Sequence, residues 1–249
     1  MIQSVIVAFS MYSKIPMPKI PWTKENMKYA LCFFPVVGAA VALVLMAVLW
    51  ACDKAGFGSF FTACMAAIVP ILVTGGIHMD GYLDTVDALS SYGDREKKLA
   101  ILKDSNSGAF AIIYGMVYFV VTIAVWTEIQ PKVLPFIGIS FVLSRTLSAL
   151  SIVSFPLAKN TGLAAAFQDG AHRKRVKTVM VCLFLIESGA SLFLNLLYGC
   201  VLILLSLVSF LIHYLLCKKT FGGITGDLAG FFLQICELMV LAGLMFAGR

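Results

Sequence analysis

Long apolar runs separated by short polar segments make up most of the chain. Each run has roughly the 20 residues that a helix needs to cross the hydrocarbon core of a bilayer. The pattern therefore predicts an all-α polytopic integral membrane protein, with residues 1–249 in a single domain. We place about seven transmembrane helices at residues 30–51, 57–75, 108–127, 133–155, 178–196, 198–216 and 228–247. The turn between the fifth and sixth runs is weak, so a single re-entrant hairpin remains an alternative there.

The N-terminal segment carries a shorter helical pattern. Residues 1–13 have apolar side chains at helical spacing, but the run is too short to cross a bilayer. We expect an interfacial helix here. It should end before Ile15-Pro16-Met17-Pro18, because prolines so close together do not continue a helix.

The composition agrees with this pattern. The chain is 60% hydrophobic and 13% charged, whereas about 25% charged residues is typical of a soluble domain. Little room is left for a separate soluble domain. The seven cysteines include no Cys-x-x-Cys pair and lie mostly in apolar runs. We interpret them as small hydrophobic side chains rather than as disulfide partners or metal ligands.

The distribution of basic residues indicates how the chain is oriented. If the N-terminus is inside the cell, fifteen of the nineteen Lys and Arg residues lie in inside segments and three in outside segments, while Arg145 lies within the fourth span. This bias predicts a protein of the cytoplasmic (inner) membrane whose N-terminus and active face are cytoplasmic. It also explains the net charge of +6 without a nucleic-acid partner, because basic residues beside a lipid bilayer contact anionic head groups.

An acidic stretch after the second predicted span carries the main candidate chemistry. Asp80, Asp84 and Asp87 are spaced by four and three residues, which places them on one face of a helix. Three carboxylates on one face repel one another unless a cation lies among them, and Mg²⁺ with a phosphorylated substrate is the usual solution. A solvated acidic loop is the alternative, but it does not explain the apolar Leu83 and Val86 between the acids.

Two glycine-rich turns at membrane boundaries are candidate substrate-binding segments. Gly75-Gly76 and Gly222-Gly223 are each followed within five residues by an acid. Because glycine lets backbone N–H groups approach an anion closely, both turns are candidates for holding phosphate or metal. The alternative is that these glycines end or pack membrane helices, where glycine is common.

Polar residues near the acids and the second turn extend the candidate site. Thr225 and Asp227 are predicted to point a hydroxyl and a carboxylate toward the acids, to cap the last span, or both. His78 is a candidate general base, metal ligand or substrate donor. The ligand role is the least favoured of the three, because Mg²⁺ prefers oxygen ligands.

A polar segment before the third span and a charge within the fourth span complete the candidates. Lys103 is expected to neutralise charge on a transferred phosphate, and Asp104 is either a fourth carboxylate or the residue that holds Lys103, with Ser105 beside them. A capped helix start with an interfacial lysine is the alternative. Arg145 is costly near the middle of a span, so we expect it to bind an anionic substrate or to pair with Glu187.

Taken together, these residues resemble the cobalamin synthase family, whose members are adenosylcobinamide-GDP ribazoletransferases. The main motif is Gly75-Gly76-Ile77-His78-Met79-Asp80-Gly81-Tyr82-Leu83-Asp84-Thr85-Val86-Asp87, followed by Lys103-Asp104-Ser105 and Gly108. Three shorter pieces fit in order, namely Ile15-Pro16-Met17-Pro18, Gly162-Leu163 and Gly222-Gly223-Ile224-Thr225-Gly226-Asp227. The resemblance covers essentially the whole chain. It departs from the family pattern at Ala88, where many members carry glycine, and at Lys159, where arginine is expected.

The resemblance implies a reaction and a cofactor. Family members join adenosylcobinamide-GDP and α-ribazole, or its 5′-phosphate, to give adenosylcobalamin, or its phosphate, and GMP at the end of cobalamin biosynthesis. Mg²⁺ is the implied cofactor. On this hypothesis Asp80, Asp84 and Asp87, with Asp104 or Asp227, hold one or two metal ions on the pyrophosphate.

The same hypothesis gives roles to the remaining candidates. Lys103 and Arg145 add positive charge at the substrate, and the two glycine turns, Ser105 and Thr225 contact it. One carboxylate or His78 takes the proton from the ribazole hydroxyl. Contact with other cobalamin-pathway enzymes is suggested by the pathway rather than by any residue.

Two other functions are consistent with spaced carboxylates beside a membrane. One is a different membrane transferase that acts on pyrophosphates or CDP-alcohols, although the Asp-Gly-x-x-Ala-Arg run typical of CDP-alcohol enzymes is absent. The other is a transporter for cations or metabolites, which would place the acids near mid-membrane with broken helices. Carboxylates open to the cytoplasm would favour the transferase.

Overall fold

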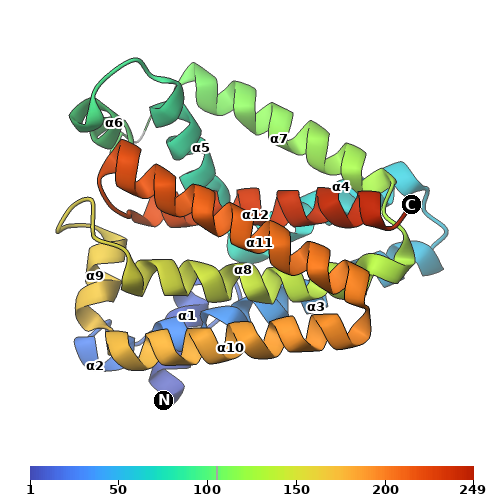
Figure 1. The fold of residues 1–249 in the computed structure, drawn as a ribbon, viewed down its shortest axis with the longest axis horizontal. Helices are drawn as coiled ribbons and strands as arrows, with labels where there is room; N and C mark the ends of the chain where they lie inside the picture. Colours follow the sequence, from blue (N-terminus) through green and yellow to red (C-terminus); the bar gives the residue numbers. More distant parts are fainter. Residues whose placement is uncertain (105) are drawn as a thin grey trace.

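The chain forms a bundle of long helices with shorter helices gathered near one end (Figure 1). The computed structural model describes residues 1–104 and 106–249. The helices are α1 (Ile2–Tyr12), α2 (Lys24–Met27), α3 (Phe34–Lys54), α4 (Ser59–Thr74), α5 (Ile77–Ser90), α6 (Arg95–Ile101), α7 (Ala109–Thr127), α8 (Leu134–Ser154), α9 (Leu163–Gly170), α10 (Arg173–Leu194), α11 (Leu196–Leu216) and α12 (Gly226–Ala247). Within the described ranges there is no β-strand, and the only β-type pairing is an isolated parallel bridge between Leu157 and Ile224.

The helix lengths confirm the predicted membrane class. Within the part of the chain that the structure describes, six helices are long and apolar enough to cross a bilayer, and a bent pair makes a seventh crossing if its halves count as one span. The fifth and sixth apolar runs are two full helices, α10 and α11, which meet at Asn195. The side chain of Asn195 caps α11 by accepting a hydrogen bond from the backbone N–H of Tyr198 at 3.1 Å.

The second predicted span needs a correction, because residues 57–75 do not form one crossing helix. Helix α4 has only 16 residues, and α5 follows it at an angle of 100°. Gly75 (φ +66°) and Gly76 (φ +80°) both adopt the left-handed conformation that favours glycine. The N–H of Gly76 donates to the carbonyl of Ile71 at 2.9 Å, which closes α4 in a turn that frequently ends helices. The glycine pair therefore redirects the chain so that the acidic helix leaves the line of α4.

Helix α8 lies within the bundle and packs against α3, α10 and α12. Most of its side chains are buried, including several serines. Helices α7, α10 and α11 instead leave many large apolar side chains exposed. A bundle whose outer helices present apolar side chains is the arrangement expected of helices in contact with lipid.

The predicted N-terminal helix is present as α1, which packs against the start of α3 and the short segment before it. Ser4 Oγ donates to the backbone carbonyl of Asn26 at 2.9 Å, and the face that includes Val7 and Tyr12 is buried. Tyr12, the last residue of the helix, reaches the cavity described below.

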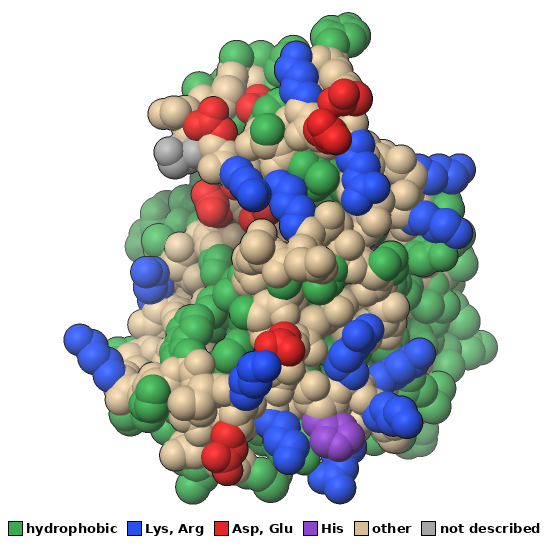
Figure 2. Space-filling model, turned by 90° about the vertical axis from the view of Figure 1, so that its left-hand side faces the viewer, with side chains coloured by type: hydrophobic (Ala, Val, Ile, Leu, Met, Phe, Trp, Pro, Cys, Tyr) green, Lys and Arg blue, Asp and Glu red, His purple; other side chains and the backbone are tan. Residues whose placement is uncertain are grey.

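Charged side chains gather at the end of the bundle that carries α2, α6 and α9 (Figures 1 and 2). Figure 2 views this end directly and shows Lys, Arg, Asp and Glu side chains around an otherwise tan and green surface. The C-terminus lies at the opposite end of the bundle in Figure 1. The segments that were predicted to share one side of the membrane therefore share one end of the fold.

Candidate active site

A cavity of about 250 Å³ lies at the charged end of the bundle. Its wall includes the first turns of α5, α9 and α12, the last residue of α1, the first residue of α3 and the C-terminal part of α8. Loop residues complete the wall, among them Lys103 and Lys159. Segments from the whole length of the chain therefore meet at this one cavity.

Two glycines let the acidic helix α5 approach α12 closely. A Cβ atom at Gly81 would lie 2.7 Å from the carbonyl oxygen of Asp227, and one at Gly230 would lie 3.1 Å from the carbonyl oxygen of His78. Any side chain at Gly81 would push the two backbones apart, because Cβ atoms essentially never come so close to an oxygen. This close packing places Asp80 of α5 and Asp227 of α12 on the same cavity wall.

The other predicted carboxylates lie at different distances from the cavity. Asp84 does not line it, but Asp80, Asp227 and Asp87 are near enough for their charges to act on the Asp84 carboxyl group. Asp87 lies against the backbone at Gly108, where an added Cβ would be 2.3 Å from its carboxylate oxygens. The acidic face of α5 therefore extends from the cavity toward the start of α7.

Asp104 has a local role in the structure. Its carboxylate accepts hydrogen bonds from the backbone N–H of Asn106 at 3.0 Å and from the Asn106 side chain at 2.9 Å. It does not line the cavity, whereas its neighbour Lys103 does. Ser105, which was predicted to contact substrate, lies outside the described residues.

Groups that favour anions also line the cavity, beside its carboxylates. Ile77, Leu163 and Gly226, the first residues of α5, α9 and α12, all line it. Helix N-termini carry partial positive charge and unpaired N–H groups, so they favour anions. The ammonium groups of Lys103 and Lys159 add full charges.

Lys159 is held in place beside the cavity. Its ammonium group donates to the backbone carbonyl of Leu99. Burial, and then the nearby charge of Lys103, lower the pKa of Lys159, while Asp227 acts in the opposite direction. Lys159 was not among the predicted site residues, and the sequence marked it only as a position where arginine is expected; the structure places it near Lys103 on the cavity wall.

The structure gives the glycine turns roles in packing. Gly222 (φ +71°) lies against the guanidinium group of Arg95, and Gly223 lies against the backbone of Leu157 and Ala158. Gly75 lies against the Lys14 side chain. None of the four glycines of the two turns lines the cavity. Their predicted contact with substrate therefore stays a prediction.

Thr225 combines both predicted roles in one place. Its hydroxyl caps α12 by accepting a hydrogen bond from the N–H of Leu228 at 3.2 Å, and it donates to the Asp227 carboxylate at 3.3 Å. Thr225 also lines the cavity. It therefore helps to fix the position of Asp227 at the start of α12.

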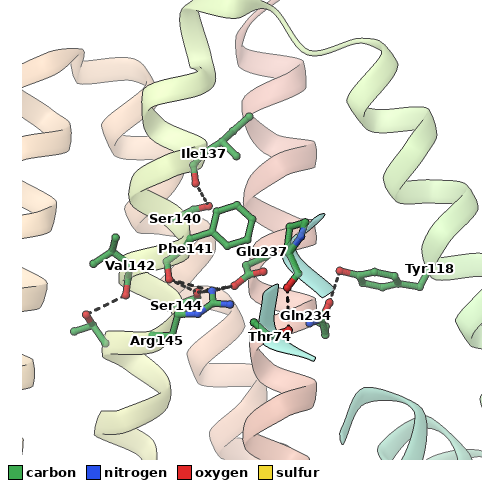
Figure 3. Close-up of polar contacts among 12 residues, drawn as sticks. Thr74, Tyr118, Ile137, Ser140, Phe141, Val142, Ser144, Arg145, Gln234 and Glu237 are labelled. Carbon is green, nitrogen blue, oxygen red and sulfur yellow. Dashed lines mark hydrogen bonds and ion pairs between the residues drawn. The ribbon is translucent and has the colours of Figure 1, made fainter. Parts of the chain in front are cut away.

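Arg145 pairs with an acid other than the one predicted. Its guanidinium group forms an ion pair with Glu237 of α12, and Ser144 Oγ donates to the same carboxylate at 2.9 Å (Figure 3). The alternative pairing with Glu187 is wrong, since Glu187 instead accepts a hydrogen bond from Thr146 at 2.8 Å. Sequence reasoning could not choose between the two acids because the choice depends on which helices face α8.

The Arg145 pair belongs to a buried polar layer within the bundle. In Figure 3 Arg145 and Glu237 extend toward each other from α8 and α12, and Tyr118 of α7 donates to Gln234 at 2.6 Å beside them. Arg145 does not line the cavity and is 1% exposed. Its immediate surroundings are those of a structural ion pair.

The innermost part of the cavity is aromatic. Tyr12, Phe34, His78 and Phe167 line it and are buried. Of these four, only His78 was predicted. No local sequence signal marks the other three, because they come from α1, α3 and α9 and meet only when the bundle forms.

The donor chemistry of the site fits Mg²⁺. Among residues 1–104 and 106–249, no three His, Cys, Asp or Glu side chains converge closely enough to enclose a metal ion. Mg²⁺ does not require such a cage, because it keeps several waters and binds through one or two carboxylates together with substrate phosphates. Asp80 and Asp227 on one wall, beside a cluster of anion-binding groups, supply those oxygen ligands.

Comparison with known proteins gives a consistent picture. The model of the family described as cobalamin-5-phosphate synthase matches residues 4–245. A protein of Lachnoclostridium phytofermentans named adenosylcobinamide-GDP ribazoletransferase is 44% identical over 238 residues, which cover 96% of this chain and 91% of the relative. Proteins with the same name from Clostridium perfringens and Carboxydothermus hydrogenoformans are 30% and 29% identical; the alignments cover 94% and 96% of this chain, and 94% and 95% of those relatives. No solved structure matches the chain.

Proposed function

The chain belongs to the cobalamin-5-phosphate synthase family, and from this we propose that it is an adenosylcobinamide-GDP ribazoletransferase. It joins adenosylcobinamide-GDP to α-ribazole, or to α-ribazole 5′-phosphate, in a late step of cobalamin biosynthesis. The products are adenosylcobalamin, or its phosphate, and GMP.

The observation that carries this proposal is the convergence of charged groups at one cavity. Asp80, Asp227 and Lys103 line it together with the first turns of three helices. A pyrophosphate substrate needs positive groups to bind its oxygens, and a hydroxyl nucleophile needs a base nearby. The cavity wall carries both kinds of group.

The reaction exchanges one bond to phosphorus for another. The ribazole hydroxyl oxygen forms a bond to the phosphorus that carries cobinamide. The bond from this phosphorus to the bridging oxygen of the pyrophosphate breaks, and GMP leaves with the electron pair. The hydroxyl proton passes to a carboxylate of the acidic cluster or to His78.

Residues of this chain stabilise the negative charge that develops on the phosphate oxygens during this exchange. Lys103 and Lys159 neutralise negative charge on the phosphate oxygens, and the N-terminal ends of α5, α9 and α12 add to their effect. We assign Asp80, Asp84, Asp87 and Asp227 to holding Mg²⁺. When bound, the metal supplies Lewis-acid polarisation of the phosphate oxygens.

We further propose that the protein lies in the cytoplasmic membrane with its N-terminus and the cavity on the cytoplasmic side. The excess of Lys and Arg at the cavity end of the bundle supports this orientation. Both substrates are polar phosphate esters or nucleosides, so the proposed cytoplasmic cavity would receive them without passage across the bilayer. Contact with other enzymes of the pathway on this face is part of the same proposal.

The geometry favours a transferase over a transporter. The acids lie at the charged end of the bundle beside the loop residues Lys103 and Lys159. A transport site is expected near mid-membrane between helix repeats. The buried charges in the bundle interior, Arg145 and Glu237, already pair with each other.

The decisive experiment measures GMP release by the detergent-solubilised protein from adenosylcobinamide-GDP and α-ribazole 5′-phosphate, with and without Mg²⁺. We expect metal-dependent GMP together with an equal amount of corrinoid product. GMP without a joined product would mean simple hydrolysis and would contradict the proposal. So would the absence of product from protein that is shown to be folded.

A further inference from the structure

The cavity has two chemically different ends. Asp80 and Lys103 on its wall are exposed to solvent. Phe34 and Phe167, also on its wall, are 1% and 0% exposed. One end therefore suits a charged group, and the other, which we call the aromatic floor (Tyr12, Phe34, His78, Ser148 and Phe167), suits an apolar one.

The rings of the aromatic floor pack against one another, with Tyr12 in contact with the other three. The centroid of the Tyr12 ring lies 4.1 Å from that of Phe34, 5.7 Å from that of Phe167 and 6.0 Å from that of His78. The His78 and Phe34 centroids are 5.7 Å apart. Centroid separations of this size are those of rings that pack directly against one another, so the four side chains form one continuous aromatic surface at the inner end of the cavity.

Two polar atoms at the aromatic floor have no partner. His78 Nε2 and Ser148 Oγ are buried and form no hydrogen bond with any described residue. Both residues line the cavity and are 4% and 0% exposed. A buried polar group without a partner is destabilising, so these atoms point to a ligand that supplies the missing hydrogen bonds.

We propose that the aromatic floor binds the benzimidazole base of α-ribazole. This inference rests on the proposed function and names the part of the substrate that occupies the inner end of the cavity. The base is flat, carries two methyl groups and has one bare ring nitrogen that accepts a hydrogen bond. Apolar rings with one or two neutral donors match this chemistry.

The other aromatic base in the reaction, guanine, fits the aromatic floor poorly. Guanine presents an amino group and a ring N–H that need acceptors, usually a carboxylate or backbone carbonyls. The five side chains of the aromatic floor include no carboxylate. With the benzimidazole base at the aromatic floor, the ribose extends toward Asp80 and Lys103, where the hydroxyl reacts.

The Tyr12 hydroxyl adds a third donor. Burial raises the pKa of Tyr12, so its hydroxyl keeps its proton at any working pH and can donate to the ribose or the base. The aromatic floor thus supplies neutral donors and no charge.

The test compares two serines with similar surroundings. Ser148 and Ser188 are both buried in long helices with unpartnered hydroxyls, but only Ser148 lines the cavity. We expect Ser148→Ala to weaken binding of α-ribazole roughly three- to tenfold, the loss of one neutral hydrogen bond. Equilibrium dialysis of the full-length protein in detergent with α-ribazole measures this directly. Ser188→Ala should bind α-ribazole as the wild type does.

Turnover provides the second readout. The KM for α-ribazole should rise in Ser148→Ala while the KM for adenosylcobinamide-GDP stays unchanged. A rise only in the KM for adenosylcobinamide-GDP would place guanine at the aromatic floor and overturn the inference, as would unchanged binding of α-ribazole.

If Ser148→Ala does not fold, a competition experiment with the wild-type protein and bound α-ribazole replaces it. Free dimethylbenzimidazole should displace α-ribazole and guanosine should not; the reverse result overturns the inference. Wild-type protein that binds α-ribazole but releases no GMP would refute the proposed function alone.

Discussion

Gly81 of α5 and Asp227 of α12 lie so close together that a single methyl group on Gly81 would come within 2.7 Å of the Asp227 carbonyl oxygen. The contact involves backbone atoms on one side, so a bulkier residue cannot be accommodated by a rotamer change. It sets the spacing between the two helices that carry the candidate metal-binding carboxylates.

Gly81→Ala should therefore impair catalysis more than folding. Separating α5 from α12 moves Asp80 away from Asp227, and we expect kcat to fall at least tenfold, which corresponds to about 1.4 kcal/mol. Gly138→Ala is the control, because a Cβ at Gly138 in α8 meets nothing within 4 Å. The control should keep full activity, and equal losses in both variants would show that the Gly81 contact is unimportant.

Asp84→Asn should abolish turnover while the protein still inserts and folds. The change removes a charge from the cluster formed with Asp80, Asp87 and Asp227 but keeps the shape of the side chain. GMP release measured over a range of Mg²⁺ concentrations checks this. Asp53→Asn, at an exposed acid near the end of α3, is the control and should leave activity unchanged. Near-normal turnover by Asp84→Asn would remove Asp84 from the site.

Lys98→Met should loosen the end of the acidic helix. The Lys98 ammonium group donates to three backbone carbonyls at the end of α5, those of Ala88 (3.0 Å), Leu89 (3.2 Å) and Ser91 (2.9 Å). Hydrogen bonds that involve a charged group contribute roughly 1.5–3 kcal/mol each to stability. We expect a clear fall in Tm in detergent. Lys97→Met, which removes one exposed bond to a single carbonyl, should lower Tm less.

Glu237→Leu should destabilise the protein strongly, because it leaves the Arg145 guanidinium buried without its partner. Breaking a buried ion pair in this way costs roughly 3–5 kcal/mol. The double variant Arg145→Met with Glu237→Leu should recover most of the lost thermal stability. If the double variant is stable but inactive, Arg145 has the substrate role that the sequence suggested.

The affinity for phosphate should weaken at alkaline pH. Because its pKa is lowered, Lys159 loses its proton at a lower pH than an ordinary lysine. The positive charge is present below that pKa and lost above it, so the KM for adenosylcobinamide-GDP should rise as the pH increases through it. Lys159→Arg should remove this rise, since a guanidinium group stays charged. Lys54→Arg is the control and should keep the wild-type pH profile. A wild-type profile for Lys159→Arg as well would exclude Lys159 as the cause of the rise in KM.

The sequence alone predicted the membrane class, the position of the acidic helix and, within the described residues, the six helices long enough to cross. Hydrophobic runs predict transmembrane helices because the thickness of the bilayer sets the length that a crossing helix needs. The spacing of Asp80, Asp84 and Asp87 reported a helix face because the spacing depends only on local geometry. Asp227 was also predicted, from its glycine turn, and the structure places it beside Asp80 on the cavity wall.

Other features depend on how helices face one another and could not be predicted in this way. The pairing of Arg145 with Glu237 rather than Glu187 follows from the packing of α12 against α8. Tyr12 and Phe167 reach the cavity from helices far apart in the sequence. A turn at Gly75-Gly76 was predicted, but its 100° angle was not, because hydropathy reports apolar runs and not the angle between successive helices.

The shortness of α4 has a consequence for the lipid environment. Its 16 residues rise about 24 Å at about 1.5 Å per residue, which is less than the hydrocarbon core of roughly 30 Å. If α4 starts at the far surface, the bend at Gly75 and the beginning of the acidic helix lie below the near surface, or the bilayer thins around them. The depth of the reacting groups is then set by acyl chain length. Lipids of different thickness should change the rate of this enzyme without any change to its residues.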